Sequence, residues 1–166
     1  MSSHDEPRSR ERHHQDRQIH EVTHDPYKAR FRPKEPAVCP TCGVVYQNGS
    51  YHWIARPAGA HEHVCPACQR AADRFPAGYV TLAGTFLAEH HKEILQLVHN
   101  EETRARNEHP LERIIEIVED DGKTLITTTD LHLPRRIGDA IHKAYQGTLD
   151  TQYARDQYQV RVNWQR

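Results

Sequence analysis

Cys39-Pro40-Thr41-Cys42 and Cys65-Pro66-Ala67-Cys68 contain all four cysteines of this chain and decide how its first half folds. Within each pair the cysteines are three positions apart, so two thiolates can converge on one ion from a tight turn. The 22 residues between the pairs leave room for a hairpin. Four thiolates complete the tetrahedral coordination of zinc and leave no thiol for catalysis and no open position for water. The pattern therefore predicts a structural Zn site with Cys39, Cys42, Cys65 and Cys68 as its ligands.

Two disulfides are an alternative use of the same cysteines. Disulfides are favoured in secreted proteins. Met1 opens a polar, charged segment without the apolar stretch of a secretory signal, so we expect the cysteines to bind a metal.

The composition indicates which classes of function to expect. The chain has 166 residues, of which 36% are hydrophobic, and a net charge of −1 with histidine neutral. No apolar run reaches the roughly 18 to 20 residues that span a bilayer, so we expect no membrane association and a cytoplasmic location. The near-neutral charge argues against partners bound by bulk electrostatics, and any nucleic-acid contact would need a local basic patch.

The sequence pattern predicts an α+β protein in four parts. Residues 1–36 are polar and charged with few apolar residues, which is typical of a disordered arm. Residues 37–84 form the zinc finger, in which Asn48-Gly49 predicts a hairpin between the cysteine pairs and the second pair leads into a helix that ends before Pro76. A knuckle, a hairpin and a helix in this order indicate a treble-clef-like finger. Residues 85–110 are predicted to form a linking helix with Thr85 as its N-cap.

Residues 111–166 are predicted to form a ββαββ domain. Apolar residues on both sides of Asp121-Gly122 indicate a β-hairpin. Asp130 can cap the following helix, which has Pro134 in its first turn. The closing segment alternates apolar and polar residues from Gln159 to Trp164, the pattern of a half-buried strand, with 149–153 as its partner. We therefore expect an antiparallel sheet with one face covered by a helix.

No catalytic signature is found in the sequence. It lacks a glycine-rich phosphate loop and a nucleophile elbow, and its cysteines are assigned to the metal. The adjacent Asp120 and Asp121 are explained by turn preference. We therefore expect a protein that is not an enzyme and has no small-molecule substrate.

Two groups of basic residues are candidates for nucleic-acid binding. Lys28, Arg30 and Arg32 alternate with aromatic residues, a composition that can follow a phosphate backbone while stacking on bases. Arg135, Arg136 and Arg161 are expected on the surface of the C-terminal domain, where they could contact phosphates. A solvated linker and an ordinary charged surface are the alternative interpretations. The finger also carries Tyr46, Tyr51 and Trp53, which could stack on bases or fill a small core.

The segment from Cys39 to Cys68, with Gly78-Tyr79-Val80-Thr81-Leu82-Ala83-Gly84 and the ending Tyr158-Gln159-Val160-Arg161-Val162, resembles the Nmd-three family. Members of that family are zinc-binding proteins associated with the large ribosomal subunit, and the eukaryotic members are its export adaptors. The resemblance covers about 38–166 and implies the four cysteines as zinc ligands. It also implies RNA or the ribosome as the partner of a non-enzymatic zinc-finger protein.

Two other functions are alternatives. Cys39-Pro40-Thr41-Cys42-Gly43 is similar to the first knuckle of rubredoxins, in which four thiolates hold a redox-active iron, so an iron electron carrier is one of them. The second pair continues as Gln69-Arg70 and lacks the glycine of a matching knuckle. A protein–protein adaptor is the other alternative, and the near-neutral charge favours it.

Overall fold

The computed structural model of the protein describes residues 25–29, 32–154 and 156–166. Its helices are α1 (Pro26–Ala29), α2 (Pro66–Asp73), α3 (Thr85–Glu89), α4 (His91–Glu108) and α5 (His132–Tyr145). Its strands are β1 (Ala37–Val38), β2 (Val45–Gln47), β3 (Ser50–His52), β4 (His61–Glu62), β5 (Gly78–Ala83), β6 (Ile114–Asp120), β7 (Lys123–Thr128), β8 (Thr148–Tyr153) and β9 (Val160–Gln165). The predicted α+β class is confirmed. Of the arm expected to be disordered over 1–36, residues 1–24 and 30–31 lie outside this description, and Pro26–Ala29 form α1.

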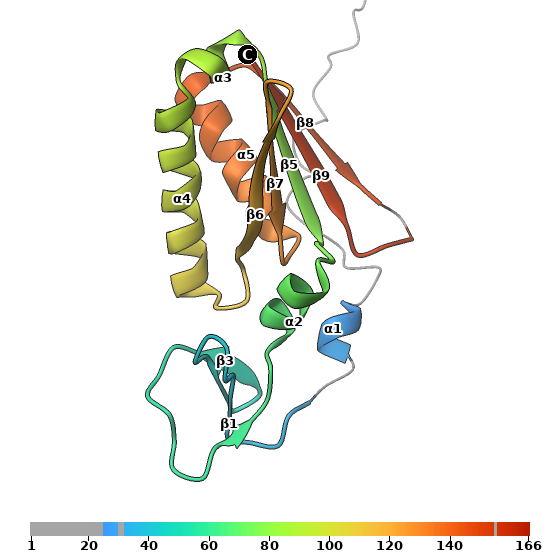
Figure 1. The fold of residues 1–166 in the computed structure, drawn as a ribbon. Coiled ribbons are helices and arrows are strands. Elements are labelled where there is room, and N and C mark those ends of the chain that lie inside the picture. Colours follow the sequence, from blue (N-terminus) through green and yellow to red (C-terminus); the bar gives the residue numbers. More distant parts are fainter. Residues whose placement is uncertain (1–24, 30–31, 155) are drawn as a thin grey trace, which may run out of the picture.

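The larger unit has two layers, a five-stranded sheet with α4 and α5 against one face (Figure 1). The strand order is β6-β7-β5-β9-β8, with β5 antiparallel to β7 and parallel to β9. The segment Gly78–Ala83, grouped above with the finger, is therefore the central strand of this sheet. The ββαββ elements surround it instead of forming a sheet alone, because a parallel partner distant in the sequence leaves no local pattern.

The core of the larger unit follows the predicted periodicities. Alternate residues of β5 and β9 are buried, and those between them face the open side of the sheet. Apolar residues of α5 and α4 cover the buried side. The buried set is Ala77, Val80, Leu82, Leu87, Ile94, Val98, Ala105, Ile126, Leu131, Leu133, Ile137, Ile141, Val160, Val162 and Trp164. The segment expected to be a linking helix is thus part of the core.

Turn chemistry places both predicted hairpins correctly. Asn48 and Gly49 have φ of 55° and 78° between β2 and β3, and Asp121 and Gly122 have φ of 48° and 73° between β6 and β7. Two consecutive positive φ values match the twist of antiparallel strands, and Asn-Gly and Asp-Gly adopt them readily.

The helix expected to start at Thr85 is interrupted. It divides into α3 and α4 at His90, whose φ is −119°. Thr85 is the first helical residue and not the cap, since Gly84 precedes the helix with φ of 106°. A Cβ on Gly84 would lie 2.1 Å from the carbonyl oxygen of Arg166, so the close approach of the chain end requires glycine there.

The smaller unit, the finger, has very little core. Its sheet has the order β3-β2-β1-β4, with strands of two or three residues. Its buried cluster consists of Cys39, Val44, Cys65 and Ala67, and its strands add the buried side chains of Ala37, Val38 and Val45. Such a cluster buries too little apolar surface to hold a fold by itself, so the cysteines must supply most of the stability of this unit.

Candidate metal centre and the cavity beside it

The four cysteines meet at one point in the finger. Their sulfur atoms all lie within 4.8 Å of one another, so the four residues could hold a metal ion. A tetrahedral site with metal–sulfur bonds of about 2.3 Å has sulfur–sulfur edges of about 3.8 Å. The Sγ atoms of Cys42 and Cys65 are 3.8 Å apart. The predicted ligand set is therefore assembled at a spacing that fits a single ion.

The two pairs reach the centre through different local structures. Cys39 and Cys42 lie in a knuckle in which Gly43 N donates to Cys39 O at 2.8 Å, and Gly43 has φ of 82°. Cys65 instead lies at the N-terminus of α2, where its sulfur accepts from Cys68 N at 3.4 Å. Pro66 occupies the first helical position, where no N–H is needed. A turn thus presents one pair and a helix start presents the other.

Hydrogen bonds to sulfur favour the thiolate form that binds metals. Cys65 N donates to the Sγ of Cys39 at 3.3 Å inside the buried cluster. The hydrogen bond that Cys42 and Cys65 share lowers the pKa of Cys42 to about 4 and, with burial, raises the pKa of Cys65, while burial raises the pKa of Cys68. The Arg113 guanidinium acts to lower the pKa of all three thiols. Because metal ligation requires thiolates, such donors favour metal binding.

Arg113, which sequence reasoning missed, completes the metal centre. It precedes β6 in the larger unit and is only 8% exposed. Its guanidinium nitrogens donate to Cys68 Sγ at 3.2 Å, to Cys42 Sγ at 3.2 Å and to Cys65 Sγ at 3.8 Å. Its Nε donates to the carbonyl oxygen of Pro110 at 2.8 Å, which fixes the plane of the group. The larger unit therefore places a positive charge directly on the sulfur cluster.

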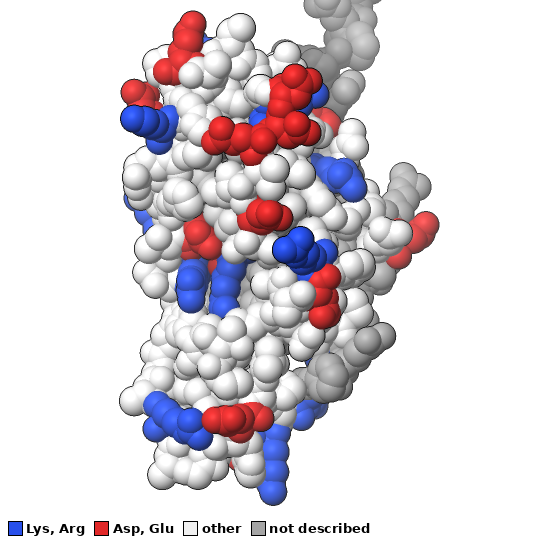
Figure 2. Space-filling view, in the orientation of Figure 1, with Lys and Arg blue, Asp and Glu red and all other residues white. Residues whose placement is uncertain are grey.

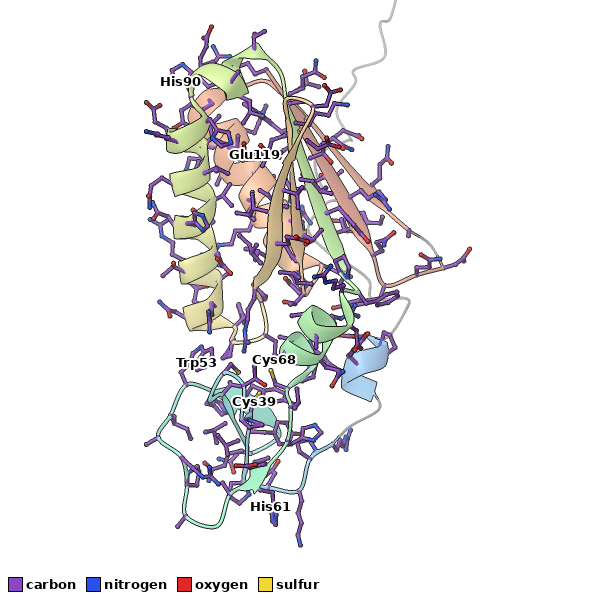
Figure 3. The ribbon with its side chains drawn as sticks, viewed as in Figure 1. Cys39, Trp53, His61, Cys68, His90 and Glu119 are labelled. Atoms are coloured by element: carbon purple, nitrogen blue, oxygen red, sulfur yellow. The ribbon has the colours of Figure 1, made fainter. Side chains whose placement is uncertain are left out.

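Trp53 joins the finger to the larger unit beside this arginine. Its Nε1 donates to the carbonyl oxygen of Arg106, in the last turn of α4, at 2.8 Å. The guanidinium carbons of Arg106 and Arg113 lie 5.2 Å and 5.5 Å from the centre of its ring. Figure 3 shows Trp53 and Cys68 close together below the end of α4. Cation–π contacts and one hydrogen bond thus connect the hairpin side of the finger to α4.

A second connection runs through a buried ion pair. Arg70 of α2 is 1% exposed and donates to Asp25 Oδ1 at 2.8 Å. Its guanidinium carbon lies 4.3 Å from the ring centre of Tyr27 and 5.5 Å from that of Tyr158, just before β9. The helix that contains Cys68 and is capped by Cys65 is thereby tied to α1 and to the larger unit.

A cavity of about 730 Å³ lies where α1, the finger and the larger unit meet. The finger contributes Tyr46 and Tyr51 to its wall. The loop after α4 and the start of α5 contribute Glu112 and Asp130. The remaining lining residues are Asp25, Lys28, Arg32, Gly49, Ser50, Pro66, Ala67, Arg70, His109, Pro110, Leu111, Thr129, His132, Arg136 and Tyr158.

Two carboxyl groups that line this cavity are destabilised in their charged form. Burial, followed by repulsion from Asp130, raises the pKa of Glu112 to about 7. Burial also raises the pKa of Asp130, although its Oδ2 accepts from the backbone N–H groups of His132 and Leu133 at 2.7 Å and 3.0 Å. Leu131, not Asp130, directly precedes α5, but the Asp130 carboxylate satisfies the first two backbone N–H groups of the helix as a cap would. Its other oxygen, Oδ1, has no hydrogen-bond partner among the described residues.

The structure divides the residues expected to contact nucleic acid into two groups. Lys28, Arg32 and Arg136 line the same cavity, although they are distant in the sequence. Arg161 lies elsewhere, on the open face of the sheet, with its guanidinium carbon 4.4 Å from the ring centre of Tyr79. Arg135 lies in α5 and does not line the cavity. Arg30 falls outside the described residues.

The charged side chains on one face of the molecule do not gather into a patch of one sign (Figure 2). On the face shown in Figure 2, basic and acidic side chains are interspersed. No helix within 25–29, 32–154 and 156–166 combines the length and the apolar character that crossing a bilayer would demand.

Comparison of the chain with protein-family models, with curated proteins and with solved structures found no match.

Proposed function

We propose that this is a non-enzymatic, treble-clef-like zinc-finger protein that binds RNA, and that its metal fastens the finger to the larger unit. The observation that carries the structural role is Arg113, which donates to three of the four sulfurs from outside the finger. A site closed by four thiolates and covered by a guanidinium has no open position for a substrate or for water.

The geometry favours zinc over the iron of an electron carrier. Only the first pair has the glycine knuckle, in which Gly43 N donates to Cys39 O, while the second pair begins α2. This asymmetry differs from the paired knuckles of the rubredoxin alternative. Purified protein should be colourless and contain one zinc per chain. A red protein with thiolate-to-iron absorption would instead establish the electron carrier.

The basic residues of the cavity support RNA as the partner. Lys28 and Arg32 are exposed and line the cavity together with Tyr46 and Tyr51. Cations and aromatic rings side by side are what a single-stranded nucleic acid requires, because phosphates pair with the cations and bases stack on the rings. The near-neutral surface means that such binding would be local. Ribosomal RNA is the source that the family resemblance implies.

Binding of single-stranded RNA to the zinc-loaded full chain tests this function. Fluorescence anisotropy at increasing salt should show affinity falling steeply, since each neutralised phosphate releases counterions. The double variant Lys28→Gln, Arg32→Gln should weaken binding and reduce the salt slope by about 1 to 2. Lys123→Gln, in the β6–β7 hairpin, is the matched control and should bind normally.

Two results would contradict the RNA proposal. The first is absence of RNA binding by zinc-loaded protein at low salt. The second is capture of a protein partner with little salt dependence, which is the behaviour of an adaptor with a neutral interface. Cosedimentation of the native protein with ribosomal particles, before and after nuclease treatment, separates ribosomal from other RNA.

A further inference from the structure

The cavity beside the metal centre has the size and composition of a binding site. Its volume of about 730 Å³ lies inside the range of about 300–1,000 Å³ typical of sites for small ligands. The finger, α1 and the larger unit all contribute to its wall, so it exists only while these parts are docked. The contents of that wall indicate the ligand.

Aromatic side chains form one part of the wall. The rings of Tyr46 and Tyr51 are 4.9 Å apart between centres and inclined at 56°, so each supports the other. Rigid neutral rings of this kind are suited to stack against a flat nitrogenous base.

Cationic side chains form another part, and they are not equally available. Arg136 donates to Glu101 at 3.0 Å and to Glu108 at 3.1 Å, so its charge is already compensated. Lys28 and Arg32 are exposed, and none of the ion pairs among the described residues involves them. These two residues are therefore the ones placed to meet a phosphate.

Two carboxyl groups of the wall could select one kind of base. Asp130 is 8% exposed, and its Oδ1 lacks a partner among the described residues. Glu112 is half-buried beside it, and none of the hydrogen bonds among the described residues reaches its carboxylate. Asp130 is buried and already caps backbone N–H groups, so Glu112 is the accessible carboxylate of the two and the one that can accept from a ligand supplying N–H donors.

The hydrogen-bonding edges of the four bases differ in how well they match a carboxylate. Guanine presents two adjacent N–H donors, N1–H and the 2-amino group, which match the two oxygens of one carboxylate. Adenine and cytosine place an acceptor nitrogen next to their amino group, and that acceptor would repel a carboxylate. Uracil offers one N–H between two carbonyl oxygens.

We propose that this cavity holds a guanine nucleotide, with Glu112 accepting from the base edge and Lys28 and Arg32 facing its phosphate. The proposal rests on the proposed RNA-binding function and names the nucleotide that the site selects. Glu112 is thus a specificity-determining residue, while Lys28 and Arg32 contribute affinity for any base.

The test uses zinc-loaded full chain and fluorescent octamers of uridine with G, A, C or U at one central position. The G octamer should bind roughly ten-fold more tightly than the others, the scale of one bidentate base contact. Glu112→Gln should abolish that preference, because its amide NH₂ faces a guanine donor. Arg32→Gln should weaken all four octamers alike and preserve the preference. Unchanged circular dichroism of each variant verifies its fold.

Guanosine monophosphate, added as a competitor, identifies the source of the nucleotide. If it displaces the G octamer at an affinity equal to that of the octamer, the site takes a free nucleotide. If it competes only weakly, the site takes a guanosine within RNA. Equal binding of all four octamers would overturn the guanine assignment and leave RNA binding intact. A G preference that survives in Glu112→Gln would overturn the role of Glu112. Failure to bind any octamer or the nucleotide would overturn both proposals.

Discussion

The finger and the five-stranded unit of this protein reach a stable fold by different means. The larger unit buries a continuous apolar cluster that includes Leu82, Ile137 and Trp164. The finger buries a small cluster of Cys39, Val44, Cys65 and Ala67, together with Ala37, Val38 and Val45, and its remaining cysteines are partly exposed. Burial of apolar area stabilises the first unit, and the proposed metal would stabilise the second through its thiolate ligands. The two units should therefore respond to different perturbations.

Removal of the metal should separate the two units most clearly. Structural zinc contributes on the order of 10 to 16 kcal/mol of apparent free energy in finger peptides, far more than the small cluster around Val44 can supply. Treatment with a strong chelator, or Cys39→Ser, should unfold the finger and leave the larger unit with a melting temperature within a few degrees of its original value. Differential scanning calorimetry would then show one remaining transition. A single transition that shifts as a whole would mean that the two units are not independent.

A substitution that creates a cavity in the core should destabilise the larger unit and leave the finger unchanged. Leu82 lies on the central strand β5 and is fully buried. Leu82→Ala removes packed methyl groups and should lower the free energy of unfolding of this unit by about 2 to 5 kcal/mol. The zinc content should be unchanged. Val118→Ala is the control, since Val118 is 38% exposed on the edge strand β6 and should cost under about 1 kcal/mol. Loss of zinc from Leu82→Ala would show that the finger depends on this core.

Arg113 couples the two units, and its substitution should lower the stability of the finger. A hydrogen bond to a charged group contributes about 1.5 to 3 kcal/mol to stability. Arg113→Gln should therefore lower the free energy of unfolding of the finger by about that amount. Zinc transfer to a chromogenic chelator should be faster in this variant. Arg104→Gln is the matched control, because Arg104 is an exposed arginine of α4 whose guanidinium pairs with Glu101 of the same helix. Equal transfer rates in both variants and the wild type would remove Arg113 from the metal centre.

Glu112 should give the smallest effect, and one that depends on pH. Burial raises the pKa of Glu112 from its ordinary value of 4.5 to about 7 in the folded protein. The folded state therefore binds the proton more tightly than the unfolded state, and stability falls as pH rises from about 4.5 to 7. Asp130 and Glu108 oppose the charge of Glu112, whereas Arg136 and Lys28 favour it. Because the side chain is only half-buried, Glu112→Gln should stabilise the protein by about 1 kcal/mol at pH 8 and hardly at all at pH 4. Urea unfolding of both proteins at the two pH values measures this difference. Equal stability of the two at pH 8 would show that the carboxylate is well solvated.

Local chemistry explains what the sequence predicts well. Cysteine spacing identifies the ligand set because both members of each pair lie in one turn. Asn48-Gly49 and Asp121-Gly122 identify their hairpins because few dipeptides accept two positive φ values. Alternation in β9 identifies its buried face before its partner is known.

Features that depend on distant partners leave no such signal. Gly78–Ala83 is a central strand because it pairs with β9, some eighty residues later, and nothing within the segment indicates this. Arg113 is one of many arginines, and only the docking of the two units brings it to the sulfurs. Three of the basic residues singled out, Lys28, Arg32 and Arg136, line one cavity for the same reason. The sequence can suggest that these residues are exposed, but it cannot show that the fold brings them to one cavity.

Hydrogen–deuterium exchange with and without bound zinc tests most directly whether the metal holds the finger together and fastens it to the larger unit. On chelation, amides of the finger and of the loop around Arg113 should lose protection, while amides of β5, β7 and β9 should keep theirs. Unchanged protection in the finger would contradict the structural role of the metal, and loss of protection throughout the sheet would contradict the independence of the larger unit.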